Sequence, residues 1–412
     1  MPTDDERPMH DIESLAAVAT GRTASLFADD LAETQGAIRA AVEGRRLLII
    51  GGAGTIGSST TELLTRFSPA AVHLVDQNEN GLAELTRNLR SREGGLGDIE
   101  FKTFPIDYGS AIMGLVFDTE APYDLVLNFA ALKHVRSEKD VPSLLQMLDT
   151  NLVKNRSLMD RLAESGFAGR YFCVSTDKAA NPVSLMGASK RVMEHLIFSR
   201  ACTPEFRGGV TSARFANVAF SDGSLLQSFV NRLAKKQPLV APRATSRYFV
   251  SPRESGEICA IAALIAPPDS ILVPRLDPAE HLVELEAVAR GFLAAHGLEV
   301  DLIEDEETAK RAARSAARRY PLVLSALDTS GEKPYEEFVG SHESVRDVGL
   351  HSFEAVSYVP APAGSLEALL DMVDRAMSGT APLDKGALVS AIAAVVPELR
   401  HKETGRNLDG RM

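Results

Sequence analysis

A β-rich run that leads straight into a glycine-rich turn narrows the possible folds most. Residues 46–50 (RLLII) are followed by GGAGTIG at 51–57, and a helical pattern begins directly after it. Gly51, Gly54 and Gly57 allow a tight turn, and a helix that starts here points the positive end of its dipole at an anion. A strand, a glycine turn and a helix in this order predict a unit that binds the pyrophosphate of a dinucleotide.

Further β-rich runs alternate with helical patterns along the next part of the chain. The runs lie at 71–75, 100–104, 124–129, 170–175 and 209–215, and helical patterns such as 144–162 and 190–198 lie between them. Mostly apolar strands that alternate with helices predict an α/β fold, because parallel strands need helical crossovers. Crossovers are almost always right-handed, so we expect a Rossmann-like, doubly wound parallel sheet.

The remaining sequence suggests four parts. Residues 1–45 are expected to form a helical arm, because Leu26, Phe27, Leu31 and Ile38 recur at roughly helical spacing; it would pack on the main domain or on a second subunit. The dinucleotide-binding domain would cover 46–220, and a smaller substrate-binding lobe interleaved with it would cover 221–350. The expected C-terminal helical extension is 351–412. Beyond residue 220 the pattern predicts strands at 271–276 and 301–305, and helices at 282–296, 306–320, 365–377 and 385–396.

Composition excludes several classes of protein. The chain has 44 basic and 56 acidic residues, a net charge of −12 that argues against a general nucleic-acid binder. Its three cysteines form no C-x-x-C pair, so no disulfide framework or zinc knuckle is expected, and no metal. The N-terminus lacks an apolar signal core, and no apolar run is long enough to span a bilayer. We therefore expect a cytoplasmic protein without a membrane span.

An acid at the end of the second β-rich run points to NAD as the dinucleotide. The Asp76 carboxylate could accept both ribose hydroxyls of NAD and would repel the extra phosphate of NADP; the alternative is a solvated acid at a strand end. Asp107, after the third run, is a candidate for the adenine. The small residues at 128–131 would let the backbone lie beside the cofactor. The residues predicted to bind NAD on this basis are Gly51, Gly54, Thr55, Ile56, Gly57, Asp76, Asp107 and Ala130.

The segment after the fifth β-rich run carries the most specific signal. Residues 175–182 read STDKAANP, and residues 186–190 read MGASK. In these motifs the chain resembles the extended short-chain dehydrogenase/reductase family, and within it the nucleotide-sugar 4,6-dehydratases that act on UDP-N-acetylglucosamine. The resemblance spans about residues 46–337, and the tail HKETGRNLDGRM (401–412) also resembles the end of bacterial members. Its motifs are GGAGTIGS (51–58), NFAALKHV (128–135), STDKAANP (175–182), MGASK (186–190), RFANV (214–218), SRYFVSPRE (246–254) and GEKPYEE (331–337).

The resemblance implies roles for the residues of STDKAANP and MGASK. Lys190 would bind the nicotinamide ribose, one helical turn after Met186 on the same helix face. The position of Met186 usually holds a tyrosine base, and a thioether cannot exchange a proton; a subgroup of these dehydratases also has Met there. The proton transfers would therefore fall to Thr176, Asp177 and Lys178.

In the implied reaction, NAD takes a hydride from C4 of the sugar, and the new ketone acidifies the C5 proton. Lys178 would remove that proton as a neutral amine, and burial or nearby positive charge could lower its pKa. Asp177 would protonate the C6 hydroxyl so that water leaves, Thr176 would hydrogen-bond the C4 oxygen, and hydride would return to C6. The alternative for Asp177 and Lys178 is a surface ion pair.

Further residues would bind the sugar nucleotide. Lys133 and His134 are expected to line the sugar pocket, although a structural role for His134 is nearly as plausible. Asn217 would contact the diphosphate, and the guanidinium of Arg247 would bind phosphate. One departure affects the nucleotide: Thr329-Ser330 replaces the Arg-Pro that usually precedes GEK. Another cation could substitute, and the stripe Arg311, Arg314 and Arg318 is either such a cation source or a solvated helix face.

The sequence thus predicts an NAD-dependent lyase, a nucleotide-sugar 4,6-dehydratase that serves surface glycan biosynthesis and forms a homo-oligomer. Two alternatives stay open. A nucleotide-sugar epimerase would share the Rossmann half, but a 4-epimerase normally needs the tyrosine that Met186 replaces. A non-catalytic NAD-binding sensor or scaffold would fit the loss of that tyrosine, whereas the adjacent Asp177 and Lys178 argue against it.

Overall fold

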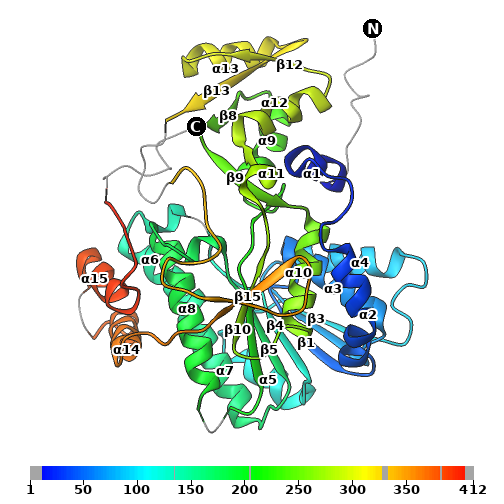
Figure 1. The fold of residues 1–412 in the computed structure, drawn as a ribbon, viewed down its shortest axis with the longest axis vertical. Coiled ribbons are helices and arrows are strands. Elements are labelled where there is room, and N and C mark those ends of the chain that lie inside the picture. Colours follow the sequence, from blue (N-terminus) through cyan, green and yellow to red (C-terminus); the bar gives the residue numbers. More distant parts are fainter. Residues whose placement is uncertain (1–11, 134, 204–205, 327–332, 381–382, 404–412) are drawn as a thin grey trace.

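A nine-stranded sheet forms the centre of the molecule, and a smaller lobe lies above it (Figure 1). The computed structural model describes residues 12–133, 135–203, 206–326, 333–380 and 383–403. The sheet has the order β14-β15-β10-β6-β5-β4-β1-β2-β3. Its strands are β1 (Arg46–Ile50), β2 (Ala71–Val75), β3 (Glu100–Phe104), β4 (Leu125–Asn128), β5 (Arg170–Val174), β6 (Gly209–Ala213), β10 (Ser270–Pro274), β14 (Val345–Asp347) and β15 (Phe353–Ser357).

Neighbouring strands from β3 to β10 pair in parallel, and β14 and β15 add an antiparallel edge. The central strands are almost wholly apolar and buried, as expected when helices cover both faces of a parallel sheet. The strand order reverses beside β1, which pairs with both β2 and β4. Ligands of open α/β sheets bind at such a switch point, outside the carboxyl ends of the strands. The predicted Rossmann-like, doubly wound sheet is confirmed.

Helices cover both faces of the sheet (Figure 1). Helices α2, α3, α4 and α10 lie on one side of it, and α5, α7 and α8 lie on the other. The helices of the body are α2 (Ala28–Val42), α3 (Thr55–Leu64), α4 (Glu79–Ser91), α5 (Ile112–Glu120), α6 (Val141–Leu148), α7 (Lys154–Glu164), α8 (Leu185–Ala201), α10 (Pro252–Leu264), α14 (Ser365–Met377) and α15 (Lys385–Val395).

The lobe has a hydrophobic core of its own, built around Phe229, Phe292 and Leu322. Two three-stranded sheets, β11-β9-β7 and β12-β13-β8, form it together with helices. Its elements are α1 (Ile12–Thr20), β7 (Asn217–Val218), α9 (Leu225–Ala234), β8 (Leu239–Pro242), β9 (Ser246–Val250), α11 (Pro278–His281), β11 (Leu282–Glu284), α12 (Leu285–Ala295), β12 (Glu299–Leu302), α13 (Glu306–Ser315) and β13 (Arg319–Ser325).

Most predicted elements are present. The strand predicted for 301–305 is β12 at Glu299–Leu302, and the first three residues of the helix predicted for 282–296 form β11. Three differences are larger. The helix predicted for 306–320 ends at Ser315, and strand β13 begins at Arg319. The segment after residue 350, predicted as helical, also contains β15, which pairs antiparallel with β10. The helix predicted for 144–162 is interrupted by a π-turn at Asp149–Val153, where Asn151 exchanges two hydrogen bonds with the backbone of Leu132.

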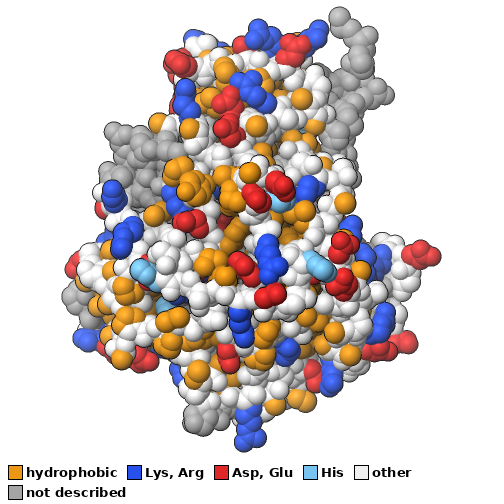
Figure 2. All heavy atoms as spheres, in the orientation of Figure 1, with side chains coloured by type: hydrophobic (Ala, Val, Ile, Leu, Met, Phe, Trp, Pro, Cys, Tyr) orange, Lys and Arg blue, Asp and Glu red, His pale blue; other side chains and the backbone are white. Residues whose placement is uncertain are grey.

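The N-terminal arm packs within the chain. Phe27 and Ile38 are buried in the core of the body, whereas Leu15 and Ala16 of α1 belong to the core of the lobe. The arm therefore packs on both the body and the lobe of its own chain. In the part of the chain that the structure describes, no helix has both the length and the apolar character to cross a bilayer. Figure 2 shows basic and acidic side chains interspersed over one face of the molecule.

Candidate active site

A cleft of about 1600 Å³ lies at the carboxyl ends of the central parallel strands, between the body and the lobe. The glycine turn after β1, the end of β2 and the segments after β4 and β5 line it from the body. Asn217 and Arg247 line it from the lobe. Nearly all residues that the sequence predicted for the site therefore meet in one cavity. His134, Thr329 and Ser330 lie outside the described residues.

The glycine turn has no room for side chains at two of its positions. A Cβ on Gly51, whose φ is +74°, would lie 2.6 Å from the amide nitrogen of Ala130, and one on Gly57 would lie 2.2 Å from the carbonyl oxygen of Gly51. Gly54 differs, because the nearest atom to its Cβ would be 3.6 Å away. It is the N-cap of α3 and provides no side-chain cap, so the first N–H groups of the helix are left to bind an anion.

Two carboxylates lie along the cofactor side of the cleft. Asp76 accepts hydrogen bonds from the N–H groups of Ala53 (3.0 Å) and Asn78 (2.9 Å), which hold it at the end of β2. Asp107 pairs with Lys154 (Oδ2–Nζ 2.5 Å). Burial opposes ionisation of Asp107, but Lys154 and the Gly109 N–H outweigh it and hold the pKa of this carboxyl below its ordinary value. Both line the cleft, so their cofactor roles remain predictions that the geometry permits.

Thr176, Asp177 and Lys178 converge on a single carboxylate oxygen. The Thr176 hydroxyl donates to Asp177 Oδ1 (2.8 Å), and the Lys178 ammonium donates to the same oxygen (3.0 Å). Lys178 Nζ also lies 3.4 Å from Asn217 Oδ1 across the cleft. The other oxygen, Asp177 Oδ2, is buried and has no hydrogen-bond partner among the described residues. These contacts place an acid and an amine in direct reach of each other at the end of β5.

Met186 and Lys190 line the same cleft from the first turns of α8. The Lys190 ammonium donates to the carbonyl oxygen of Val174 (2.9 Å). Burial lowers the pKa of Lys190, against the opposing effects of Cys173 and Glu194. The structure thus places both side chains at the cleft, and the role of Lys190 at the nicotinamide ribose stays a prediction.

Lys133 and Arg247 were predicted to bind the substrate, and Arg247 already bonds to the backbone of the protein. Lys133 lines the cleft. The Arg247 guanidinium also faces it, and donates to the carbonyl oxygens of Lys333 (3.1 Å) and Pro334 (2.9 Å). Its phosphate-binding role therefore remains a prediction. The stripe Arg311, Arg314 and Arg318 is exposed, and none of the three lines the cleft.

Two buried glutamates near the site were not singled out from the sequence. Glu336 lines the cleft and pairs with Lys333 (3.0 Å), and the GEKPYEE motif was the available signal for it. Glu194 accepts a hydrogen bond from the Ser175 hydroxyl (2.6 Å) and is fully buried. An acid one helical turn after Lys190 was the signal that could have identified it.

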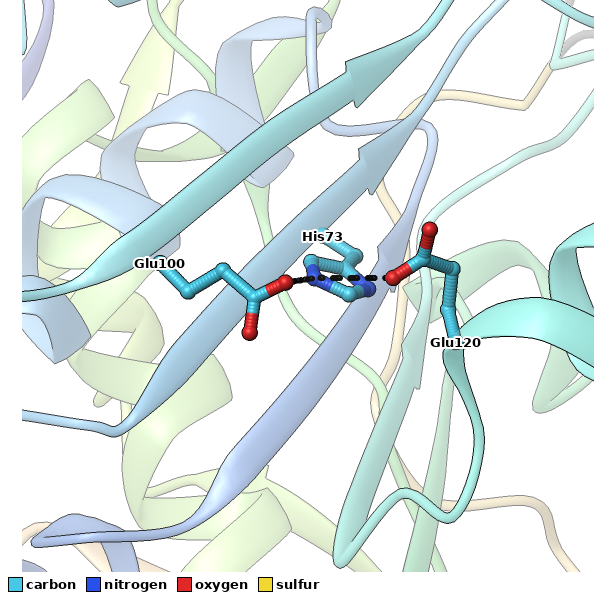
Figure 3. Close-up of side chains that lie close together, drawn as sticks. All are labelled: His73, Glu100 and Glu120. Carbon is cyan, nitrogen blue, oxygen red and sulfur yellow. Dashed lines mark ion pairs between the residues drawn. The ribbon is translucent and has the colours of Figure 1, made fainter.

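A second group of titratable side chains lies outside the cleft. His73, Glu100 and Glu120 have ligand-type atoms within 4.8 Å of one another, and Figure 3 shows both carboxylates directed at the imidazole. The Lys102 ammonium bonds to Glu100 (2.8 Å) and Glu120 (2.7 Å), so a protein cation already bridges the carboxylates. Lys102, together with Arg46, lowers the pKa of Glu100 to about 2. We interpret the group as an ion-pair network.

Comparison with known protein families shows which family the chain belongs to. Residues 47–357 match the sequence profile of the family described as "Polysaccharide biosynthesis protein", about three quarters of the chain. The chain belongs to this family. The resemblance that the motifs indicated is thereby confirmed at the level of the family.

Curated proteins are similar to the chain at modest identity. The chain is 26% identical over 303 residues to the probable polysaccharide biosynthesis protein EpsC of Bacillus subtilis, which covers 73% of this chain and 46% of EpsC. It is 30% identical over 216 residues to a UDP-N-acetylglucosamine 4,6-dehydratase (inverting) of Campylobacter jejuni, which covers 50% of this chain and 60% of that enzyme. The match thus spans about half the length of these relatives.

Solved structures share the fold. Pen from Bacillus thuringiensis superposes with a TM-score of 0.63 at 20% identity, covering 78% of this chain and 89% of Pen. A UDP-N-acetylglucosamine 4-epimerase from Methanobrevibacter ruminantium M1 has a TM-score of 0.51 at 14% identity, covering 82% of this chain and all of that chain. MoeE5, in complex with UDP-glucose and NAD, also has a TM-score of 0.51, at 15% identity and with the same coverage.

Proposed function

We propose that the chain is an NAD-dependent nucleotide-sugar 4,6-dehydratase that acts in the synthesis of a surface polysaccharide. The observation that carries the proposal is the shared carboxylate oxygen of Asp177, bonded by both Thr176 and Lys178 at the cleft. Elimination of water needs a base and an acid close together, and this pair offers both. Family membership and the similarity to a named 4,6-dehydratase support the same reaction class.

The cofactor half of the cleft fits NAD. The turn that a Cβ on Gly51 or Gly57 would fill, and the uncapped start of α3, suit a pyrophosphate. Asp76 would accept the ribose hydroxyls, and Lys190 would hold the nicotinamide ribose. When bound, NAD supplies the hydride acceptor for oxidation at C4 and the hydride that is returned at C6.

One proton transfer within the Asp177–Lys178 pair would provide both the acid and the base that the elimination needs. A carboxylate beside an ammonium holds the same number of protons as a carboxylic acid beside an amine, so one transfer over 3.0 Å produces both reactive forms. Lys178 would then take the C5 proton, and Asp177 would give its proton to the departing C6 hydroxyl. The unpartnered Asp177 Oδ2 is available to carry it.

Two other functions remain as rivals. An epimerase also oxidises C4 but returns hydride to the same carbon, and solved epimerases share the fold. Met186 argues against it, because a thioether provides no base for a sugar hydroxyl. A non-catalytic NAD-binding sensor or scaffold needs neither Asp177 nor Lys178.

Mass spectrometry of the protein incubated with UDP-N-acetylglucosamine, and then with its GDP and dTDP analogues, tests the proposal. We expect a product lighter by one water, with no net NADH. Lys178→Met should abolish this product and leave NAD bound, whereas Lys235→Met, at an exposed lysine outside the cleft, should change neither. An isomer of unchanged mass would establish the epimerase. No reaction on any substrate, with NAD copurifying, would favour the sensor.

A further inference from the structure

The C-terminal segment 397–403 lies beyond the family match and returns to the loop that carries the proposed acid and base. The family match ends at residue 357. The Arg400 N–H nonetheless donates to the carbonyl oxygen of Pro182 (2.9 Å), and a ring nitrogen of His401 lies 3.4 Å from the carbonyl oxygen of Val183. Pro182 and Val183 close the loop 176–184, which ends at the N-cap of α8. A segment beyond the residues of the family match therefore holds the far end of this loop.

The same segment is also connected to the start of the loop, through a series of ion pairs and hydrogen bonds between side chains. Glu398 pairs with Arg191 (3.2 Å), and Arg191 bonds to Glu194 (3.0 Å) and Glu343 (2.7 Å). Glu194 in turn accepts the hydroxyl of Ser175 (2.6 Å), the residue directly before Thr176. Three successive polar contacts thus connect the C-terminal segment to the start of the loop.

The middle of this connection is rigid and permanently charged. Arg214 makes two hydrogen bonds to Glu194, at 2.7 and 2.6 Å, and both side chains are fully buried. Burial opposes ionisation of Glu194, but Arg214 and Arg191 outweigh it and lower its pKa to about 2. Buried, fully bonded ion pairs fix side-chain geometry, because any displacement leaves a charge without a partner.

We propose that residues 397–403 are a brace that positions the 176–184 loop for catalysis. The inference rests on the proposed function of Asp177 and Lys178, and it adds that a segment beyond the family match sets their geometry. No residue of the brace lines the cleft in the part of the chain that the structure describes. The brace therefore acts on the rate of the reaction, through loop position, and leaves the binding of NAD and of the sugar nucleotide nearly unchanged.

A matched pair of substitutions at Arg400 isolates the backbone contact. Arg400→Pro removes the N–H that donates to Pro182, whereas Arg400→Ala keeps it and removes only the side chain. In Arg400→Pro we expect the amides of residues 176–184 to exchange hydrogen about tenfold faster than in Arg400→Ala, because a local opening loses a closing contact. The kcat should fall about tenfold with KM nearly constant, because misplaced catalytic groups slow the chemical step.

Substitutions of Glu398 test the charged contact if Arg400→Pro fails to fold. Glu398→Gln should speed exchange in the same loop and lower kcat, and Glu398→Asp should restore part of both. Glu367→Gln, at an exposed acid of α14 outside the brace, is the matched control and should change neither. If a substitution instead destabilised the whole protein, the amides of every helix would exchange faster, and not only those of residues 176–184.

The two readouts separate this inference from the proposed function. If the wild-type protein shows no dehydratase turnover, the proposed function fails, but the exchange of the 176–184 amides still decides whether the brace exists. Equal exchange and equal turnover in Arg400→Pro and Arg400→Ala, together with an unaffected Glu398→Gln, would overturn the brace. Faster exchange with unchanged kcat would also overturn it, because the segment would then be only a structural contact.

Discussion

Glu138 is a buried carboxyl directly behind the residue that replaces the usual tyrosine. Its Oε1 accepts the backbone N–H of Met186 (2.9 Å), at the first turn of α8. Its Oε2 is buried and has no hydrogen-bond partner among the described residues. Burial raises the pKa of Glu138 to about 7, and the amides of Met186 and Leu185 oppose the shift only in part. The carboxyl is therefore protonated in the folded protein over a range in which an exposed glutamate is ionised.

The raised pKa predicts a stability that declines with rising pH. The folded pKa of about 7 lies above the ordinary value of 4.5, so the contribution is fully present below pH 4.5 and is lost as the pH rises through 7. Glu138→Gln keeps an acceptor for the Met186 N–H and cannot ionise. Between pH 5 and 8, we expect the wild type to lose about 2 kcal/mol of unfolding free energy relative to Glu138→Gln.

Urea unfolding at several pH values measures this difference. Glu164→Gln, at an exposed glutamate of α7, is the control and should follow the wild-type pH profile. An identical pH profile for Glu138→Gln and the wild type would show that the carboxyl is ionised in the folded state.

Single residues differ in how far the sequence could predict them. Thr176, Asp177 and Lys178 are consecutive, so one motif placed them together, and the structure brings their side chains to one oxygen. Arg247 was predicted to bind phosphate, but part of its hydrogen-bonding capacity goes to backbone carbonyls some 86 residues away in the sequence. Glu138 gave no signal, because its partner follows 48 residues later. Long-range contacts of this kind cannot be derived from spacing.

Two glycines in the turn between β1 and α3 are expected to differ in role: one is needed for folding and the other for cofactor binding. A Cβ on Gly57 would lie 2.2 Å from the Gly51 carbonyl oxygen, so Gly57→Ala should lower the unfolding free energy by about 2 kcal/mol or more through overpacking. A Cβ on Gly54 meets no atom closer than 3.6 Å. Gly54→Ala should therefore leave stability within about 1 kcal/mol and weaken NAD binding, because the methyl group faces the cleft where phosphate would approach.

Urea unfolding and calorimetric titration with NAD, applied to both variants, measure these effects. Unchanged NAD affinity in Gly54→Ala would place the pyrophosphate elsewhere in the cleft. Unchanged stability in Gly57→Ala would show that the turn relaxes without cost.

Strands were predictable where β-rich runs alternate regularly with helical patterns. The six strands between residues 46 and 215 lie within two residues of their predicted positions; β1, β2, β4, β5 and β6 are largely buried, whereas β3 is exposed or half-buried. Strand β13 was missed because the charged residues before it continue a helical pattern, while pairing with β8 and β12 fixes its extended form. Strand β15 was missed because its partner β10 is about 80 residues earlier. Tertiary pairing overrides local preference at both strands.

The N-terminal arm joins the two hydrophobic cores of the protein. Helix α1 packs in the lobe and α2 packs on the body, and the residues between them contact Glu254 of α10. Arg22 donates to both oxygens of Glu254, the shortest contact being 2.8 Å, and also to the carbonyl oxygen of Phe249 in β9. Glu254 is 2% exposed and also completes the capping box of α10. A single arginine thus connects arm, lobe and body.

This junction predicts that Arg22 matters more than an ordinary ion-paired arginine. In Arg22→Met, Glu254 keeps the N–H groups of Leu26 and Ser251, so we expect a loss of about 2 kcal/mol, below the cost of a wholly stranded charge. Arg290→Met breaks an exposed pair with Glu286 and should cost no more than about 0.5 kcal/mol. Urea unfolding compares the two variants. Equal losses would mean that the arm adheres only through its apolar residues; a larger loss for Arg22→Met would mean that this buried ion pair helps to hold body and lobe together.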